Sequence, residues 1–237
     1  MTRPGRVLCL IPAKGGSVRL PRKNVRKLAG KTLLERTVEC ANAAGLFQRI
    51  SVSTEDEEVA AEARRLGVEV PFMRPDHLAR DPAGVVDVCL HALDEWELRG
   101  EVYDTLVILL PTSPFRRVID VTGSMERYLQ SGVEFLMSVG REEHSPLSSL
   151  IMKDGLLQPL HPEWLNRTGA KAPANLPVLV RANGAVTIVD VVRFRQERNY
   201  YGYPLAAYEM PWEYSVDVDT EKDFAMAEWV AEHVLKP

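Results

Sequence analysis

The stretch that decides the fold runs Leu10-Ile-Pro-Ala-Lys-Gly-Gly-Ser-Val-Arg-Leu-Pro-Arg-Lys-Asn24. The apolar segment 7–13 leads into it and is typical of a buried β-strand. The loop that follows contains a pair of glycines and five basic residues: Lys14, Arg19, Arg22, Lys23 and Arg26. Glycine lets backbone N–H groups approach an anion, and basic side chains add charge-assisted hydrogen bonds. The stretch therefore predicts a strand that delivers a polyphosphate-binding loop, with an ordinary solvated loop as the alternative.

Alternating strand and helix patterns surround this loop. Helical spacing of apolar residues predicts helices over 31–44 and 84–98, and the capping-box spacing of Thr54 to Glu57 predicts another helix start. Such alternation favours an α/β fold with a parallel sheet. The most apolar strand, 105–110, is expected at the centre of the sheet, where its carboxyl end delivers the next residues to the ligand-binding edge. The other predicted elements are strands over 50–53, 68–72 and 134–139, and helices over 120–130 and 222–235.

Length and composition limit the classes of function. The 237 residues suffice for one large α/β domain, here 1–237, of ordinary soluble composition. A net charge of −4 provides no global basic field for nucleic acid, so the local basic density indicates a small anionic ligand. No apolar run approaches a membrane span, so neither a nucleic acid nor a membrane is expected as a partner. Cys9, Cys40 and Cys89 are isolated, odd in number and at apolar positions of a predicted strand and two predicted helices. We therefore expect buried free thiols in a reducing cytoplasm.

Two carboxylates near the C-terminus form a candidate metal site. Asp217 and Asp219 lie two residues apart on an extended segment, so their side chains share one face. Neighbouring carboxylates repel each other unless a cation holds them, and Mg²⁺ prefers carboxylates together with phosphate oxygens and waters. The alternative is a helix cap, because Thr220 and Asp223 have capping spacing. That alternative explains Thr220 but leaves Asp217 without a role.

Five stretches resemble, in order, the motifs of the acylneuraminate cytidylyltransferases, also called CMP-sialic acid synthetases. The loop at 10–24 is similar to the bacterial signature Ile-Pro-Ala-Arg-x-Gly-Ser-Lys-Arg-Ile-Pro-x-Lys-Asn. Four positions depart from the family pattern: Lys14 replaces an arginine, Val18 a lysine, Gly84 a serine or threonine, and Leu110 a glutamine. The other four stretches are 74–81, 110–116, 179–190 and 214–224.

The resemblance implies a doubly wound, Rossmann-like nucleotidyltransferase fold and a homodimer. It implies transfer of CMP from CTP to the anomeric hydroxyl of a nonulosonic 2-keto-3-deoxy sugar acid, with release of pyrophosphate and with Mg²⁺ as the divalent cation. The irregular segment 141–175 would be an inserted dimerisation arm. A flexible surface insertion is the alternative, although it would leave four large apolar side chains awkwardly exposed. These are Leu150, Ile151, Leu157 and Trp164.

The resemblance also assigns residues to roles. The catalytic candidates are Lys14, Lys23, Asp217 and Asp219, of which the two aspartates would hold Mg²⁺. The nucleotide-binding candidates are Ala13, Lys14, Gly15, Gly16, Ser17, Arg19, Lys23, Asn24, Arg74 and Asp81. The sugar-acid candidates are Thr112, Ser113, Arg116, Arg181 and Asn183. A helix cap is an equal alternative for Asp81, and a tight turn expected at Asn183-Gly184 would lead Arg181 toward a sugar carboxylate.

Two other functions stay open at this point. One is a related nucleotidyltransferase that activates a Kdo-like acid or a sugar phosphate. The other is a non-catalytic paralogue that binds a nucleotide or a partner protein. The departures at Val18, Gly84 and Leu110 favour this second alternative, whereas the retained carboxylate pair opposes it. The sugar-facing positions depart most from the family, so the sequence leaves the identity of the sugar acid open.

Overall fold

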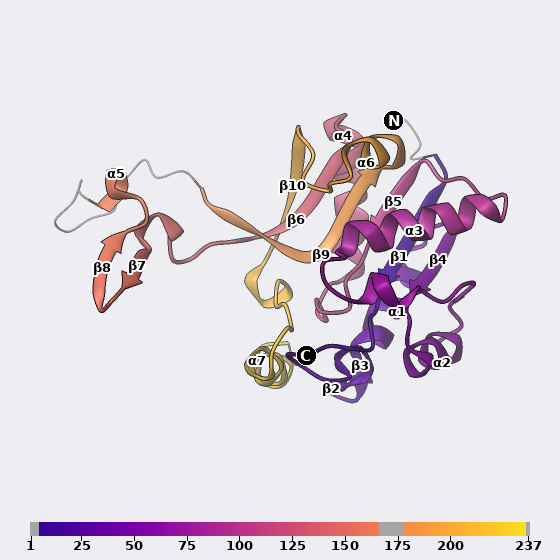
Figure 1. The fold of residues 1–237 in the computed structure, drawn as a ribbon, viewed down its shortest axis with the longest axis horizontal. Helices are drawn as coiled ribbons and strands as arrows, with labels where there is room; N and C mark the ends of the chain where they lie inside the picture. Colours follow the sequence, from indigo (N-terminus) through magenta and orange to yellow (C-terminus); the bar gives the residue numbers. More distant parts are fainter. Residues whose placement is uncertain (1–4, 166–177, 236–237) are drawn as a thin grey trace.

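The computed structural model describes residues 5–165 and 178–235, which form an α/β body with a long projection on one side (Figure 1). The body is built on a six-stranded sheet with the order β10-β6-β9-β5-β1-β4. Strand β9 runs antiparallel to both of its neighbours, and the other pairs are parallel. The predicted α/β class with a mostly parallel sheet is confirmed. The strands are β1 (Val7–Pro12), β4 (Arg49–Ser53), β5 (Thr105–Ile108), β6 (Phe135–Arg141), β9 (Val180–Asp190) and β10 (Leu205–Met210).

Helices cover both faces of the sheet because the strand side chains alternate between two cores. In β1, Val7 and Ile11 belong to the core that also contains apolar residues of α1 (Leu33–Ala44), α2 (Glu57–Arg65) and α4 (Val118–Ser131). The alternate residues Leu8 and Leu10 pack with α3 (Val85–Leu98) and α6 (Val191–Glu197). The period of two residues thus buries β1 on both sides, as expected of a parallel strand.

A third, smaller core joins the two ends of the chain. Leu20 from the glycine-containing loop and Val218 from between the two aspartates are both fully buried in it. The core also contains Phe224 of the last helix, α7 (Glu221–His233), and Leu28 of the short strand β2 (Lys27–Leu28), which pairs with β3 (Lys31–Thr32). This packing fixes the basic loop beside the carboxylate pair, although about 200 residues separate them in the chain.

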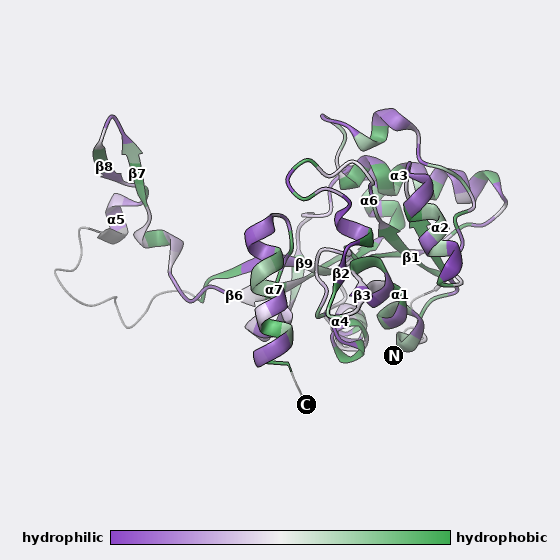
Figure 2. Cartoon of the chain, turned by 90° about the horizontal axis from the view of Figure 1, so that it is seen from below, coloured by the Kyte–Doolittle hydropathy of each residue, from purple (hydrophilic) through white to green (hydrophobic). Residues whose placement is uncertain are grey.

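The inserted arm leaves the body after β6 and returns through β9 (Figure 1). Its described part contains a hairpin of β7 (Leu150–Lys153) and β8 (Leu156–Pro159), followed by α5 (Pro162–Leu165). The hairpin carries hydrophobic stretches (Figure 2) and exposes them, with Met152 75% and Leu156 72% accessible. Leu150, Ile151 and Leu157 are exposed as well in this single copy. The side chain of Trp164 and residues 166–175 of the expected arm lie outside the described residues.

Three local predictions were wrong, and one alternative is excluded. Residues 68–72 make only an isolated bridge from Glu69 to Ser51 and form no strand. Helix α2 is capped by Asp56, whose carboxylate accepts from two backbone N–H groups, so the cap lies two residues after Thr54. Asn183-Gly184 lies inside β9, at an irregularity in its pairing with β6, because this strand continues through the expected turn. Helix α3 is capped at Gly84, which donates to the Asp87 carboxylate at 2.9 Å, so Asp81 is not its cap.

Short elements complete the fold. The 3₁₀ helices are η1 (Lys23–Val25), η2 (Asp76–Ala79), η3 (Pro146–Ser148) and η4 (Trp212–Tyr214). In the described part of the chain, none of the helices combines the length and apolar character needed to cross a bilayer.

Candidate functional site

Two cavities adjoin at the aspartate pair, because Asp217 and Asp219 line both of them. The first, here called the loop cavity, has a volume of about 340 Å³ and is lined by the basic loop and the ends of the central strands. The second, here called the arm-side cavity, has a volume of about 650 Å³ and lies at the base of the arm. Candidate residues that line the loop cavity are Lys14, Lys23, Asn24, Arg74, Asp81 and Thr112. Candidate residues that line the arm-side cavity are Arg19, Arg181 and Asn183.

The fold positions the aspartate pair through its backbone. The N–H of Val218 donates to the carbonyl of Thr112 at 2.8 Å, which ties the segment to the loop after β5. Since Val218 is buried in the third core, the flanking Asp217 and Asp219 turn toward the cavities. Thr220 is the N-cap of α7, and the Asp223 carboxylate completes its capping box by accepting from the backbone N–H groups of Asp219 and Thr220. The predicted cap at Thr220 is therefore confirmed, whereas the metal-binding role of Asp217 and Asp219 stays a prediction.

Both oxygens of the Asp219 carboxylate are bound by cations of the loop. Lys23 Nζ lies 2.7 Å from Oδ1, and Arg19 Nη2 lies 2.7 Å from Oδ2. Partial burial by itself raises the pKa of Asp219, but the hydrogen bond and charge of Lys23, with the charge of Arg19, lower it below its usual value. Asp219 is consequently held as a carboxylate at neutral pH.

Asp217 has the opposite electrostatic environment. Loss of hydration raises its pKa above the usual value, and the nearby Asp219 carboxylate adds to the rise, against a hydrogen bond from Thr112. Within residues 5–165 and 178–235, no three His, Cys, Asp or Glu side chains are grouped as a metal site. A divalent cation here would thus meet two carboxylates and take its remaining ligands from phosphate oxygens and waters. That donor set suits Mg²⁺, which binds through one or two carboxylates plus substrate phosphates.

The glycine loop is held by a residue that the sequence analysis did not single out, Glu55. Its Oε1 accepts from the N–H of Gly15 at 2.9 Å and from the N–H of Gly16 at 3.5 Å. A Cβ on Gly15 would lie 2.2 Å from Oδ2 of Asp56, so only glycine fits beside this turn. The expected backbone donors are therefore bonded to a carboxylate of the protein. The signal for Glu55 was its place directly after a parallel strand, at the carboxyl edge.

The other candidates near the loop are placed differently. Asn24 is buried and donates to the carbonyl of Lys14 at 2.7 Å, which shapes the loop as well as lining the cavity. Ala13 is buried and donates to Ser53, and Ser17 donates to Gly15 within the loop. Ala13, Gly15, Gly16 and Ser17 do not line either cavity. The basic loop therefore lines the loop cavity with Lys14, Lys23 and Asn24 rather than with these four residues.

Arg74 is a buried cation at the wall of the loop cavity. Its guanidinium donates to the carbonyl and the hydroxyl of Ser53 and lies 3.6 Å from Oε2 of Glu55. Burial lowers the pKa of Arg74, whereas the negative charge of Glu55 opposes the decrease. Glu55 Oε2 is itself buried without a hydrogen-bond partner. Glu55 and Arg74 thus form a charged support behind the basic loop.

The five sugar-acid candidates separate into two groups. Thr112 lines the loop cavity, and Arg181 and Asn183 line the arm-side cavity. By contrast, Arg116 is buried and donates to the carbonyls of Ala185 at 2.7 Å and Leu110 at 3.2 Å. The buried Ser113 hydroxyl donates to the carbonyl of Asn183 at 3.0 Å. Arg116 and Ser113 line neither cavity and instead join the end of β5 to β9.

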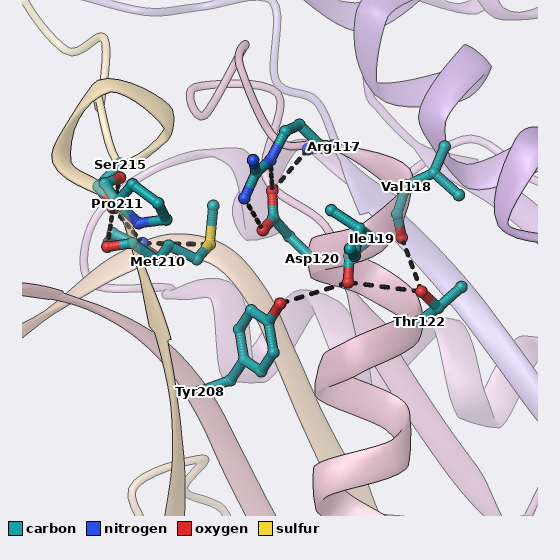
Figure 3. A network of polar contacts seen from close by, with 10 residues as sticks. Arg117, Val118, Ile119, Asp120, Thr122, Tyr208, Met210, Pro211 and Ser215 are labelled. Atoms are coloured by element: carbon teal, nitrogen blue, oxygen red, sulfur yellow. Dashed lines mark hydrogen bonds and ion pairs between the residues drawn. The ribbon is translucent and has the colours of Figure 1, made fainter.

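The wall of the arm-side cavity is built by a polar network. The Asn183 side-chain amide donates to the Ser215 hydroxyl at 3.0 Å, and its oxygen Oδ1 accepts from the Ser138 hydroxyl at 2.6 Å. Ser215 in turn donates to the carbonyl of Pro211, as Figure 3 shows. On the other side of the same view, Arg117 forms an ion pair with Asp120 at 2.8 Å. The Arg117 guanidinium also lies 3.8 Å above the ring of Tyr214. The network thus holds the segment that leads into the aspartate pair.

Charges of both signs line the arm-side cavity. Its cations include Arg141 and Arg181, and its acidic residues include Glu142 and Glu143. The Arg181 side chain is 80% exposed, and its Nε lies 3.2 Å from Oε1 of Glu142. An exposed pair of this kind contributes little to stability, so the guanidinium is available for an anionic ligand. Glu142 and Trp212 also line this cavity, and sequence reasoning did not identify either one.

The chain is similar in sequence to known proteins. The family described as cytidylyltransferase matches residues 8–148. The CMP-N,N'-diacetyllegionaminic acid synthase of Legionella pneumophila is 28% identical over 96% of this chain and 97% of that protein. The N-acylneuraminate cytidylyltransferase of Streptococcus agalactiae serotype V is 30% identical over 92% of this chain, which spans only 51% of that longer protein.

The solved structures extend the comparison to the fold. A CMP:2-keto-3-deoxy-manno-octonic acid synthetase, solved in complex with CTP, superposes with a TM-score of 0.71 over 97% of this chain and 100% of that one. The sequence identity is 14%, so this likeness concerns the fold alone. It confirms the Rossmann-like nucleotidyltransferase architecture predicted from the sequence.

Proposed function

The chain belongs to the cytidylyltransferase family, and on this premise we propose that it transfers CMP from CTP to the anomeric hydroxyl of a nonulosonic, sialic-acid-like sugar acid. The observation that carries the proposal is the meeting of two cavities at Asp217 and Asp219. A nucleotide in the loop cavity and a sugar acid in the arm-side cavity would have their reacting groups at this junction. The names of the relatives support a sugar acid as the acceptor.

The loop cavity suits a nucleoside triphosphate by charge. Lys14, Lys23 and Arg74 line it and would neutralise the phosphates, and Asn24 fixes the loop that carries the two lysines. Asp81 also lines this cavity, and its carboxylate would orient the ribose. Positioning and charge neutralisation are the main contributions that a protein makes to phosphoryl-transfer chemistry.

In the proposed reaction the anomeric oxygen attacks the α-phosphorus. A new O–P bond forms, the bond to the β-phosphate bridging oxygen breaks, and pyrophosphate leaves, while the hydroxyl proton passes to solvent. Arg181 would bind the carboxylate of the sugar acid, and Asn183 would contact the same ligand from β9. Asp217 and Asp219 would hold Mg²⁺, which when bound supplies positive charge against the phosphates.

The arm supports a homodimer. A single copy leaves Leu150, Met152 and Leu156 exposed on one hairpin, and an apolar surface of this kind is typical of a protein contact. We place the contact between two copies at this hairpin. A cytoplasmic location is consistent with the absence of disulfides at the three cysteines, all of which are buried.

Pyrophosphate release tests the proposal directly. Each of the four nucleoside triphosphates is incubated with Mg²⁺ and a panel of neuraminic, legionaminic, pseudaminic and Kdo-type acids. Release with CTP and a nonulosonic acid is expected, and the preferred acid names the substrate. Release only with a Kdo-type acid or a sugar phosphate would select the related activity instead. Tight CTP binding without release from any pair would favour a non-catalytic protein.

A further inference from the structure

We propose that Arg19 and Lys23 close Asp219 to a divalent cation until the bound anionic substrates draw them away, the triphosphate acting on Lys23 and the sugar acid on Arg19, so that the substrates themselves open the cation site. The inference rests on the proposed function, because it takes Asp219 as a cation ligand and the loop cavity as the triphosphate site. It concerns the order in which the site is assembled, and it assigns Arg19 a positioning role that differs from simple phosphate binding.

The first observation is that neither Asp219 oxygen is free of a cation. Oδ1 and Oδ2 each lie 2.7 Å from a different nitrogen, those of Lys23 and Arg19. A metal ion would have to approach the same oxygens against two positive charges. At the Asp219 carboxylate itself, one negative charge faces two positive charges. A free dication thus finds no net attraction at the site.

The second observation is that each of the two cations lines a cavity where an anion is expected. Lys23 lines the loop cavity and Arg19 lines the arm-side cavity, while Asp219 lies where the two cavities meet. Polyphosphate oxygens in the loop cavity would compete with Asp219 for Lys23. A triphosphate brings about four negative charges and would reverse the local balance in favour of a dication.

The two cations differ in their freedom to move. The Arg19 side chain is 67% exposed, so it can leave Asp219 without breaking any packing. The Lys23 side chain is only 10% exposed and is held within the site, so it would turn from Asp219 to a phosphate in place. Arg22 offers a matched control on the same loop, because its guanidinium pairs with Glu58 instead of Asp219.

A nucleotide chelates metal ions by itself, so the decisive measurement is made without one. Mn²⁺ serves as the probe, and its binding to the nucleotide-free full chain is followed by electron paramagnetic resonance. Arg19→Gln and Lys23→Met are expected to bind Mn²⁺ about five- to tenfold more tightly than the unmodified chain, a coupling of ordinary size between neighbouring sites. Arg22→Gln is expected to bind Mn²⁺ as the unmodified chain does.

Equal Mn²⁺ affinities for the unmodified chain, R19Q and K23M would overturn the proposal. Arg19→Gln keeps the test decisive if the buried Lys23 does not tolerate replacement, because Arg19 is at the surface; circular dichroism checks the fold of each variant. Double variants with Asp219→Asn are expected to lose the added affinity, and its persistence would place the cation elsewhere. This titration involves no turnover, so its failure is distinguishable from a failure of the proposed reaction.

Discussion

The loop cavity and the arm-side cavity are built in different ways. The loop cavity is walled by the ends of buried strands and by charged groups fixed in the body, such as Arg74 behind Glu55. The arm-side cavity is walled by exposed side chains at the base of the arm, among them Arg141 and Arg181. In the proposed function, the body would therefore provide a rigid site for the nucleotide. The acceptor would then be bound mainly by exposed residues that the core does not constrain.

The largest effect is expected where the two cavities meet. Asp219→Asn should lower kcat by roughly a thousandfold, because the site loses charge that would hold the cation against the transferring phosphate. The change affects both substrates at once, so no concentration of CTP or sugar acid restores the rate. Steady-state pyrophosphate release measures the loss, and circular dichroism confirms the fold. Glu221→Gln is the control, since Glu221 pairs with Arg26 at the surface; an active D219N would remove the cation assignment.

A second prediction separates the two cavities. Arg181→Ala should raise the KM for the sugar acid by about 10- to 100-fold, the usual range for losing a charge-assisted hydrogen bond, and leave the KM for CTP unchanged. Lys14→Met should do the reverse, because Lys14 lines only the loop cavity of the two. Both side chains are exposed, so neither change should unfold the chain. If the two variants shift the same KM, the division of substrates between the cavities is wrong.

The sequence predicted the loop cavity far better than the arm-side cavity, and the reason is physical. Strand ends and helix starts follow from local apolar spacing, which placed Lys14, Lys23 and Asp219 at one edge of the sheet. Local spacing does not tell whether a polar side chain faces a ligand or the protein. Arg116 shows this, because a guanidinium that binds Ala185 and Leu110 carbonyls has the same sequence signal as one that binds a substrate.

Longer-range pairing caused the other differences. Asn183-Gly184 has the composition of a turn, yet pairing with β5 and β6 draws it into one continuous strand with an irregularity. Gly184 still has a positive φ of 70°, which is the backbone conformation that a turn glycine adopts. The expectation of this conformation was therefore right, but the residue lies inside a strand rather than in a turn. Strand β10 was not predicted because only Ala206 and Met210 of its residues are buried, and this pattern is too sparse to signal a strand.

A third prediction concerns the arm, whose hairpin exposes several large apolar side chains. Leu156→Asp should shift the protein from dimer to monomer in sedimentation velocity, because it places a charge in the proposed apolar contact. Leu98→Asp is the control, as Leu98 is 81% exposed but lies at the end of α3 on the body. The Leu98→Asp variant should remain a dimer. Equal behaviour of L156D and L98D would locate the contact elsewhere or show that the chain is monomeric.

The smallest expected effect tests the rigidity of the loop cavity. Glu55→Ala removes the acceptor of the Gly15 and Gly16 N–H groups, so the loop should lose its fixed position and the KM for CTP should rise about three- to tenfold. Glu55→Gln keeps an acceptor oxygen and should restore most of the affinity. The KM for the sugar acid should stay constant in both variants. A lower KM for CTP in E55A would instead mean that Glu55 competes with the phosphates for the loop, and the support behind the loop would have to be regarded as a barrier to nucleotide binding.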